Sequence, residues 1–253
     1  MKGDRDVMEA LVKPPSEGGF QLSDGEIHYL WWFIQGSIMS PHVRQGLRKA
    51  WGSCERHAWG AVSVEASFRH GYMHGPAVLY EDLMGRALAA FEVQGPGKLW
   101  RVGRNLREKG RCPMCEMGYG PDSRGTARPE VVERGRDLSA LRAFAGHTMP
   151  YWRTTICGKC AGNGSPARCR RHLLEDTSRS LIRDVSVQRL LVEDIVHHLE
   201  KFHRSFVWGF HGTQTDEDTA ALITAVGWCS GWGLLLQIME SSCAVLVPPF
   251  GCQ

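Results

Sequence analysis

Apolar side chains recur every three or four residues along most of the chain, which is the period of an amphipathic α-helix. The longest apolar stripe lies within residues 178–206 and includes Leu181, Val185 and Val192. Short helices are expected to begin at Pro41 and to span residues 137–145, and similar patterns predict longer helices over residues 24–39, 54–68, 77–91, 178–206 and 216–229. Thr215 is placed to cap the last of these helices. We therefore predict an all-α fold.

Composition indicates an ordinary folded protein. Of 253 residues, 43% are hydrophobic and 23% are charged, and the formal net charge is +3, which is typical of a globular chain rather than a disordered one. The first 19 residues are charged and lack the apolar core of a secretory signal. No stretch reaches the roughly 18 uncharged apolar residues that a membrane span needs. We expect a cytoplasmic protein that does not enter a membrane.

The cysteines are distributed as metal ligands rather than as a disulfide framework. The chain has nine cysteines, an odd number, and no secretory signal. Six of them fall in short-spaced clusters with cysteine or histidine partners. The other three, Cys229, Cys243 and Cys252, stand alone among apolar residues and are expected to be thiols of the core or the tail.

Two cysteines three positions apart can bind one tetrahedral ion, because the turn between them brings both sulfurs together. Four short motifs offer such ligands: Cys112-x-x-Cys115, Cys157-x-x-Cys160, Cys169-x-x-His172 and Cys54-x-x-His57. Proline in the first motif and glycine in the second suit a zinc knuckle. A closed zinc site needs four ligands, so these eight residues are enough for two zinc ions. If Cys54 and His57 are instead a buried thiol and a capping histidine, one ion is expected.

The spacing leaves the division into sites open. The preferred assignment places Cys112, Cys115, Cys169 and His172 around one zinc ion. Cys157 and Cys160 then share a second ion with Cys54 and His57, which would join the two halves of the chain. The competing assignment is local and places Cys157, Cys160, Cys169 and His172 around one ion.

The Cys-x-x-His pairs also suggest how the chain is divided. Each helical stretch contains one such pair, which indicates two repeated helical units, the second stabilised by zinc. Between them, residues 98–136 are rich in arginine, glycine and proline, and Gly95-Pro96-Gly97 marks the boundary. The predicted organisation is an N-terminal tail (1–22), a first helical repeat (23–94), a basic linker with the first knuckle (95–136), a second helical repeat with a zinc cluster (137–232) and an apolar C-terminal tail (233–253).

Several runs resemble a group of uncharacterised bacterial helical proteins with tandem repeats of Cys-Pro-x-Cys, helices and Cys-x-x-His. The resemblance covers residues 23–232 and rests on residues 54–60, 75–88, 112–115, 169–172, 202–208 and the helix start at Thr215. It implies that Cys112 and Cys115 pair with Cys169 and His172, and it implies no known activity. The chain departs from the pattern in having Lys13-Pro-Pro-Ser16 where the first Cys-Pro-x-Cys is expected, and in carrying the extra pair Cys157 and Cys160.

Two classes of function follow from these residues. The first is a zinc-stabilised binding or regulatory module for a protein or a nucleic acid. Candidate phosphate contacts are six arginines near the knuckles, namely Arg101, Arg104, Arg107, Arg111, Arg170 and Arg171. The simpler interpretation of these charges is a solvated linker that offsets negative zinc–thiolate sites. The second class is a metal- or thiol-dependent enzyme that uses Cys54 and His57, or the acidic and histidine residues of the helix over 193–203.

Overall fold

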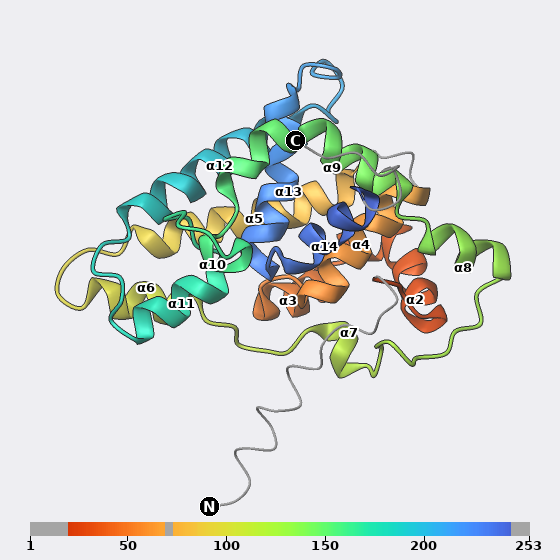
Figure 1. Cartoon of the computed structure of the whole chain (residues 1–253), viewed down its shortest axis with the longest axis horizontal. Coiled ribbons are helices and arrows are strands. Elements are labelled where there is room, and N and C mark those ends of the chain that lie inside the picture. Colours follow the sequence, from red (N-terminus) through yellow and green to blue (C-terminus); the bar gives the residue numbers. More distant parts are fainter. Residues whose placement is uncertain (1–19, 69–72, 244–253) are drawn as a thin grey trace, which may run out of the picture.

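The computed structural model describes residues 20–68 and 73–243, and these residues form helices joined by turns, with no strand among them. The predicted all-α fold is therefore confirmed. Figure 1 shows the arrangement of the helices, whose bounds are α2 (Asp24–Ile34), η1 (Ser37–Met39), α3 (Pro41–Ala50), α4 (Glu55–Phe68), α5 (His74–Phe91), α6 (Lys98–Leu106), α7 (Pro113–Glu116), α8 (Pro129–Arg136), α9 (Ser139–Trp152), η2 (Arg153–Thr155), α10 (Gly158–Ala161), α11 (Arg170–Ser178), α12 (Ser186–Arg204), α13 (Asp216–Ser230) and α14 (Gly233–Cys243).

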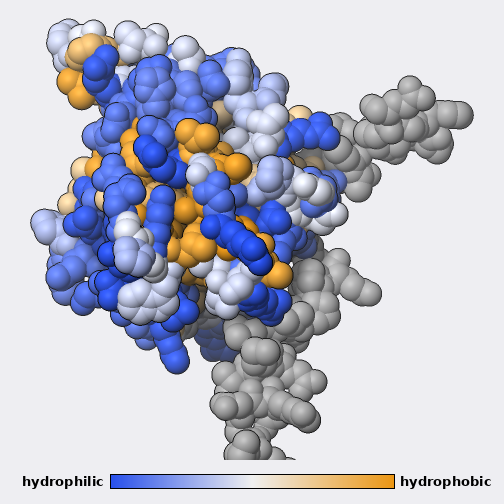
Figure 2. Space-filling view, turned by 90° about the vertical axis from the view of Figure 1, so that its left-hand side faces the viewer, coloured by the Kyte–Doolittle hydropathy of each residue, from blue (hydrophilic) through white to orange (hydrophobic). Residues whose placement is uncertain are grey.

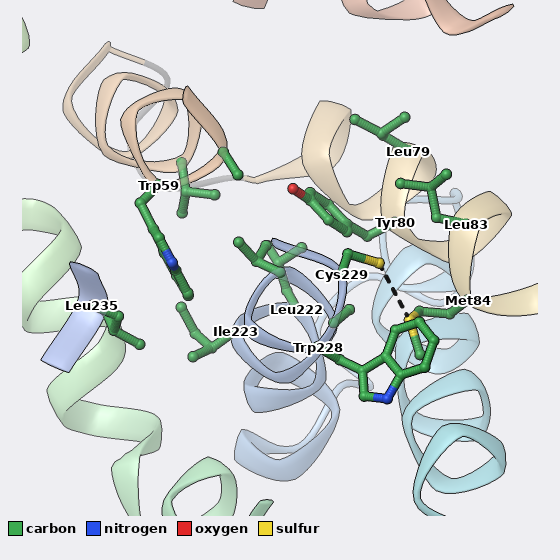
Figure 3. Packing of buried hydrophobic residues seen from close by; sticks show 14 of the residues in the cluster. Trp59, Leu79, Tyr80, Leu83, Met84, Leu222, Ile223, Trp228, Cys229 and Leu235 are labelled. Carbon is green, nitrogen blue, oxygen red and sulfur yellow. Dashed lines mark hydrogen bonds between the residues drawn. The ribbon is translucent and has the colours of Figure 1, made fainter. Parts of the chain in front are cut away.

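Helix α13 is the centre of the core. Its side chains from Ala220 to Cys229 are buried on every face, which is the pattern of a helix surrounded by others. Helices α4, α5, α9 and α12 pack around it. Figure 3 shows Trp59 and Leu235 on one side of α13, with Tyr80 and Met84 on the other. The core is thus shared between the first and second halves of the chain.

The start of α13 is fixed by a capping box, as its sequence predicts. The hydroxyl of Thr215 accepts a hydrogen bond from the amide of Asp218, and the Asp218 carboxylate accepts one from the amide of Thr215. At the other end, Gly227 lies against the indole ring of Trp232. This close approach lets the chain turn directly into α14.

The long helix predicted over 178–206 begins later than expected, because α11 ends at Ser178, residues 179–185 are not helical, and α12 starts only at Ser186. Ser180 has a φ of 56°, and the amide of Leu181 donates to the carbonyl of Asp176, which ends α11. The carboxylate of Asp184, one residue before the N-cap Val185, then accepts a hydrogen bond from the amide of Ser186, 3.0 Å away, and so satisfies the first amide of α12. Apolar periodicity continues across this break, and periodicity alone does not reveal it.

Much of the predicted basic linker is helical. Leu99, Val102 and Leu106 follow helical spacing in α6, and Val102 and Leu106 are buried against the core. Helix α8 packs on α2 and α4 through Val132. The start of the predicted apolar tail forms α14, which buries Leu235 and Ile238. The division into two repeated units stays a prediction.

None of the helices in the described part of the chain is both long and apolar enough to cross a membrane.

Candidate metal centres

Two clusters of ligand side chains form in the folded chain, each with three cysteines and one histidine. The first cluster comprises Cys54, His57, Cys112 and Cys115, and the second cluster comprises Cys157, Cys160, Cys169 and His172. Within each cluster the four ligand atoms lie within 4.8 Å of one another. Three thiolates and one imidazole are a complete tetrahedral ligand set for zinc. No other group of this kind occurs in the part of the chain that the structure describes.

The distances in the first cluster match the edges of a tetrahedron around a small ion. Nδ1 of His57 lies 3.2 Å from Sγ of Cys54, 3.3 Å from Sγ of Cys112 and 3.4 Å from Sγ of Cys115. The sulfurs of Cys54 and Cys115 are 3.7 Å apart. Zn–S bonds of about 2.3 Å and Zn–N bonds of about 2.0 Å predict edges of roughly 3.5–3.8 Å. Small side-chain movements therefore suffice to hold zinc.

The second cluster has the same dimensions. Nδ1 of His172 lies 3.2 Å from Sγ of Cys157, 3.4 Å from Sγ of Cys160 and 3.3 Å from Sγ of Cys169. The sulfurs of Cys160 and Cys169 are 3.8 Å apart. Both clusters present Nδ1 of the histidine, and each is complete without a ligand from outside the chain.

Each Cys-x-x-His pair is built on the first turn of a helix. Cys54 directly precedes α4, and Cys169 is the N-cap of α11. Their carbonyl oxygens accept hydrogen bonds from the amides of Ala58 and Leu173, at 2.9 Å and 2.8 Å. One helical turn therefore places the histidine beside the thiol, and the positive end of the helix dipole favours the thiolate.

Each Cys-x-x-Cys pair is built on a four-residue helical turn. Cys112 is the N-cap of α7, and Cys157 is the N-cap of α10. In α10, a Cβ on Gly158 would lie 2.2 Å from the carbonyl oxygen of Ser165, and the Gly158 amide donates to the carbonyl of Ala167 at 3.0 Å. Only glycine allows this approach, which folds the loop back and brings Cys169 to Cys157.

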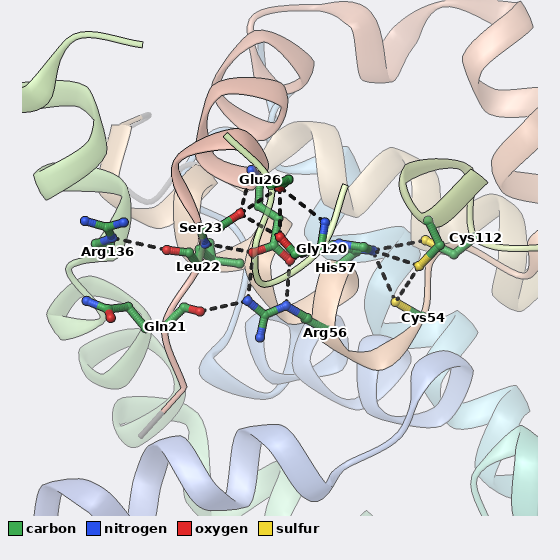
Figure 4. A network of polar contacts seen from close by, with 12 residues as sticks. Gln21, Leu22, Ser23, Glu26, Cys54, Arg56, His57, Cys112, Gly120 and Arg136 are labelled. Carbon is green, nitrogen blue, oxygen red and sulfur yellow. Dashed lines mark hydrogen bonds and ion pairs between the residues drawn. The ribbon is translucent and has the colours of Figure 1, made fainter. Parts of the chain in front are cut away.

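A buried carboxylate supports the histidine of the first cluster. Oε1 of Glu26 lies 3.1 Å from Nε2 of His57, and the Glu26 side chain is fully buried. Arg56 donates to both oxygens of Glu26, at 2.5 Å and 2.7 Å, and the amide of Ser23 donates at 2.8 Å. Figure 4 shows Glu26 between Arg56 and His57, with the other side of the imidazole facing the thiols. This bond fixes the ring so that Nδ1 faces the metal position.

These contacts set the charges of the first cluster. Burial opposes ionisation of Glu26, but hydrogen bonds from His57, Arg56 and Ser23 outweigh it and lower the Glu26 pKa to about 2. A hydrogen bond from Cys54 lowers the pKa of the Cys112 thiol well below its usual range. Burial disfavours a charged His57, yet its bonds to Cys112 and Glu26 raise its pKa to about 9. Zinc takes a neutral imidazole, so zinc binding displaces a proton from His57.

The sequence prediction omits Glu26. The signal that marks it is the Ser23-x-x-Glu26 capping box at the start of α2, in which both reciprocal hydrogen bonds form. A capping box predicts a helix start, however, and does not predict that the same carboxylate reaches a histidine 31 residues away.

The histidine of the second cluster has a different environment. His172 is partly exposed and borders a cavity of about 180 Å³ that Glu55 and Arg171 also line. Asp176 instead stabilises the loop of this cluster: it forms an ion pair with Lys159, and its Oδ2 lies 2.8 Å from Nε of Arg168. In the second cluster, side-chain contacts thus stabilise the loop that carries the ligands. In the first cluster, they orient the histidine ligand itself.

The preferred division of the ligands is wrong, and the competing local division describes the second cluster. Cys112 and Cys115 lie with Cys54 and His57. Cys112 and Cys115 lie in the first cluster because the chain after α6 runs back along α3. The amide of Lys109 donates to the carbonyl of Lys49 at 2.7 Å, and the indole of Trp51 donates to the carbonyl of Arg107 at 3.1 Å.

These bonds carry the first knuckle along α3 to the start of α4, so the pairing of Cys112 and Cys115 with Cys169 and His172 that the resemblance implies is not found. Cys54 and His57 are part of a four-residue cluster rather than an isolated buried thiol and capping histidine.

Cys229 behaves as the core thiol that its sequence environment predicts. It is buried, its sulfur lies 3.8 Å from that of Met84, and burial raises its pKa to about 12. The side chain of Cys243 and the whole of Cys252 lie outside the described residues.

The six candidate phosphate-binding arginines do not form one patch. Arg170 is buried, stacks on Trp51 and forms an ion pair with Glu108 at 2.7 Å, so it is a structural residue. Arg101 donates to the backbone carbonyls of Gln94 and Pro96, just before α6. Arg111 and Arg171 are exposed, with Arg171 beside the second cluster. Only two of the six, Arg104 and Arg107, line one groove.

The helix over residues 193–203 does not assemble a di-iron site. Its histidines point to separate partners: His198 lies 2.7 Å from Oδ1 of Asp218, and His203 contacts Glu81. Glu193 and His197 are exposed. No metal-type group that includes this helix occurs among the described residues.

No protein-family model, curated protein or solved structure matches the chain.

Proposed function

We propose that the chain is a zinc-binding helical protein in which two structural zinc ions, one at each Cys/His cluster, hold the framework of a binding or regulatory module. The observation that supports this proposal most strongly is that each cluster provides a complete set of four protein ligands. Each offers three sulfurs and one imidazole nitrogen within 4.8 Å of one another. Soft thiolates in tetrahedral sets select zinc among common ions, and four protein ligands leave no position for a substrate.

The elements that carry the ligands support a structural role. Helices α7 and α10 have four residues each, and helices of this length are not stable by themselves. The first zinc ion would tie the knuckle at α7 to α4, and the second would tie α10 to α11. Zinc would thereby order the long connections on either side of these helices.

An enzyme is the competing hypothesis, and the geometry gives it less support. Cys54 and His57 are committed to the first cluster, and Glu26, which Arg56 holds in place, occupies the far side of the imidazole. A catalytic zinc ion usually has three protein ligands and an open position. The cavity beside His172 is small, at about 180 Å³, and it borders ligands that are already part of a complete set.

X-ray absorption spectroscopy of the zinc-loaded protein tests the proposal. We expect an average shell of three sulfurs at about 2.3 Å and one nitrogen at about 2.0 Å per ion. Chelation should also lower the thermal stability and the helical content. An oxygen ligand in the shell at either ion would indicate an open site and favour the enzyme hypothesis.

A further inference from the structure

A groove with an apolar floor lies between α6 and α11, away from both Cys/His clusters. Its volume is about 850 Å³, and Leu99, Leu174 and Ile182 contribute apolar surface to it. Trp100, at its edge, is 65% exposed. Figure 2 faces the end of the molecule where α6 and α11 lie, and it shows an apolar area across the centre of this face, bordered by hydrophilic side chains. A large exposed apolar surface with a polar rim is typical of a binding site.

The rim of this groove carries positive charge. Arg104, Arg107 and Arg183 line it, and no acidic side chain of the described residues does so. None of the three guanidinium groups forms an ion pair with a carboxylate in the described part of the chain, whereas the neighbouring Arg168 and Arg170 both do. Arg104 stacks on Trp100, 4.8 Å from the ring centre. The groove therefore selects a ligand that is both apolar and anionic.

The positive charges lie toward both ends of the groove. Helices α6 and α11 run antiparallel, because Arg170 at the start of α11 donates to the carbonyl of Leu106 at the end of α6, and Gly103 faces Thr177. Arg107 is thus near the start of α11, and Arg183 follows its end. Arg107, the C-cap of α6, lies seven positions after Trp100, which corresponds to about 10 Å along the helix axis.

This distribution of charge distinguishes between classes of ligand. A fatty acid or a mononucleotide carries its charge at one end of an apolar or aromatic body. An amphipathic helix with acidic residues on both sides of its apolar face presents charge at both ends, and its apolar anchors recur over a similar length of about 10 Å. Leu181, which lies between the lining residues Ser180 and Ile182 in the sequence, is also apolar and 64% exposed.

We propose that the groove between α6 and α11 binds an acidic amphipathic segment of a partner protein, whose apolar side chains contact Leu99, Leu174 and Ile182 and whose carboxylates pair with the arginines. This inference rests on the proposed function, because the second zinc ion would hold the start of α11 and so one wall of the groove. It narrows the partner of the module to a protein with negative charge around an apolar stripe.

Selection from a library of random 16-residue peptides displayed on phage, with the full-length zinc-loaded chain as bait, tests this inference. We expect the selected peptides to have apolar residues at helical spacing with Asp or Glu on both sides. For one synthetic peptide from the selection, the double variant Arg104→Glu/Arg107→Glu should weaken binding at least about tenfold, because like charges then face each other. Arg153→Glu is the matched control, since Arg153 is exposed and lies outside the groove. A peptide with Lys in place of its acidic residues should recover binding to the double variant.

Measuring the zinc content of the same preparation shows whether a negative result contradicts the groove assignment or the proposed zinc sites. Selection of no peptide, of peptides without acidic residues, or of peptides that bind the double variant equally well would overturn the groove assignment while two bound zinc ions leave the framework intact. Binding of a single-stranded oligonucleotide or of dodecanoate in the groove, with no peptide selected, would also overturn it. Fewer than two zinc ions would instead contradict the proposed function.

Discussion

At the scale of single residues, the structure separates side chains that would bind metal from those that hold the ligands in place. A hydrogen bond with Glu26 orients His57, and hydrogen bonds from Arg56 and the amide of Ser23 stabilise the charged form of Glu26. His172 receives no such carboxylate among the hydrogen bonds of the described residues, and Asp176 stabilises its loop instead. The two clusters thus have the same ligands but different supports, and we expect them to respond differently to mutation.

Glu26→Gln should weaken zinc binding at the first cluster only. The amide is neutral and supports the histidine less well, and loss of such a contact typically costs 10- to 100-fold in metal affinity. Competition with a chromogenic chelator measures the affinity of each ion. Asp24→Asn is the control, because Asp24 is an exposed carboxylate on the same helix. Equal weakening of both ions, or an unchanged first ion, would contradict the role of Glu26.

At the scale of helices, the central element tolerates no added volume at its end. A Cβ on Gly227 in α13 would lie 2.4 Å from the ring of Trp232, whereas a Cβ on Gly85 in α5 would meet nothing within 4 Å. Both glycines are inside helices, so alanine brings the same gain in helix propensity at each position. The atoms that the added Cβ meets therefore decide whether the substitution raises or lowers the free energy of unfolding.

Gly227→Ala should therefore destabilise the protein by about 1–3 kcal/mol, because overpacking forces Trp232 or the helix to move. Gly85→Ala should stabilise it by roughly 0.5–1 kcal/mol. Denaturant unfolding of the zinc-loaded protein measures both changes. If Gly227→Ala were as stable as Gly85→Ala, the described contact between α13 and Trp232 would be incorrect.

Helix type was predictable from the sequence, while the helix limits, the helices α6, α8 and α14, and the four-residue helices α7 and α10 were not. The apolar spacing of α4, α5 and α13 and the cap at Thr215 depend on residues near in sequence, which is why they were correctly predicted. In α6, arginines between Leu99, Val102 and Leu106 obscure the spacing. The break between α11 and α12 depends on the left-handed conformation of Ser180, which the spacing of apolar residues does not report.

At the scale of the whole molecule, tertiary structure decides which ligands share an ion. The eight candidate ligands were predictable because Cys-x-x-Cys and Cys-x-x-His are local motifs. Their division was not, because the first cluster joins Cys54 to Cys115 across 61 residues. Hydrogen bonds such as that of Lys109 to Lys49 determine that path, and no motif encodes them.

Pairs of alanine substitutions test this division directly. Cys54→Ala/Cys115→Ala removes two ligands from one cluster and should abolish one of the two zinc sites. Cys54→Ala/Cys160→Ala removes one ligand from each cluster and should weaken both ions. Native mass spectrometry with a competing chelator counts the ions that remain. The division first preferred from the sequence predicts the opposite result for each pair.

The measurement that tests the central claim most directly is elemental analysis of the purified wild-type protein, with the protein concentration determined independently. Two closed Cys/His clusters predict two zinc ions per chain. One zinc ion would mean that one cluster is not a metal site. Iron, or no metal, would contradict the account of a zinc-held helical framework.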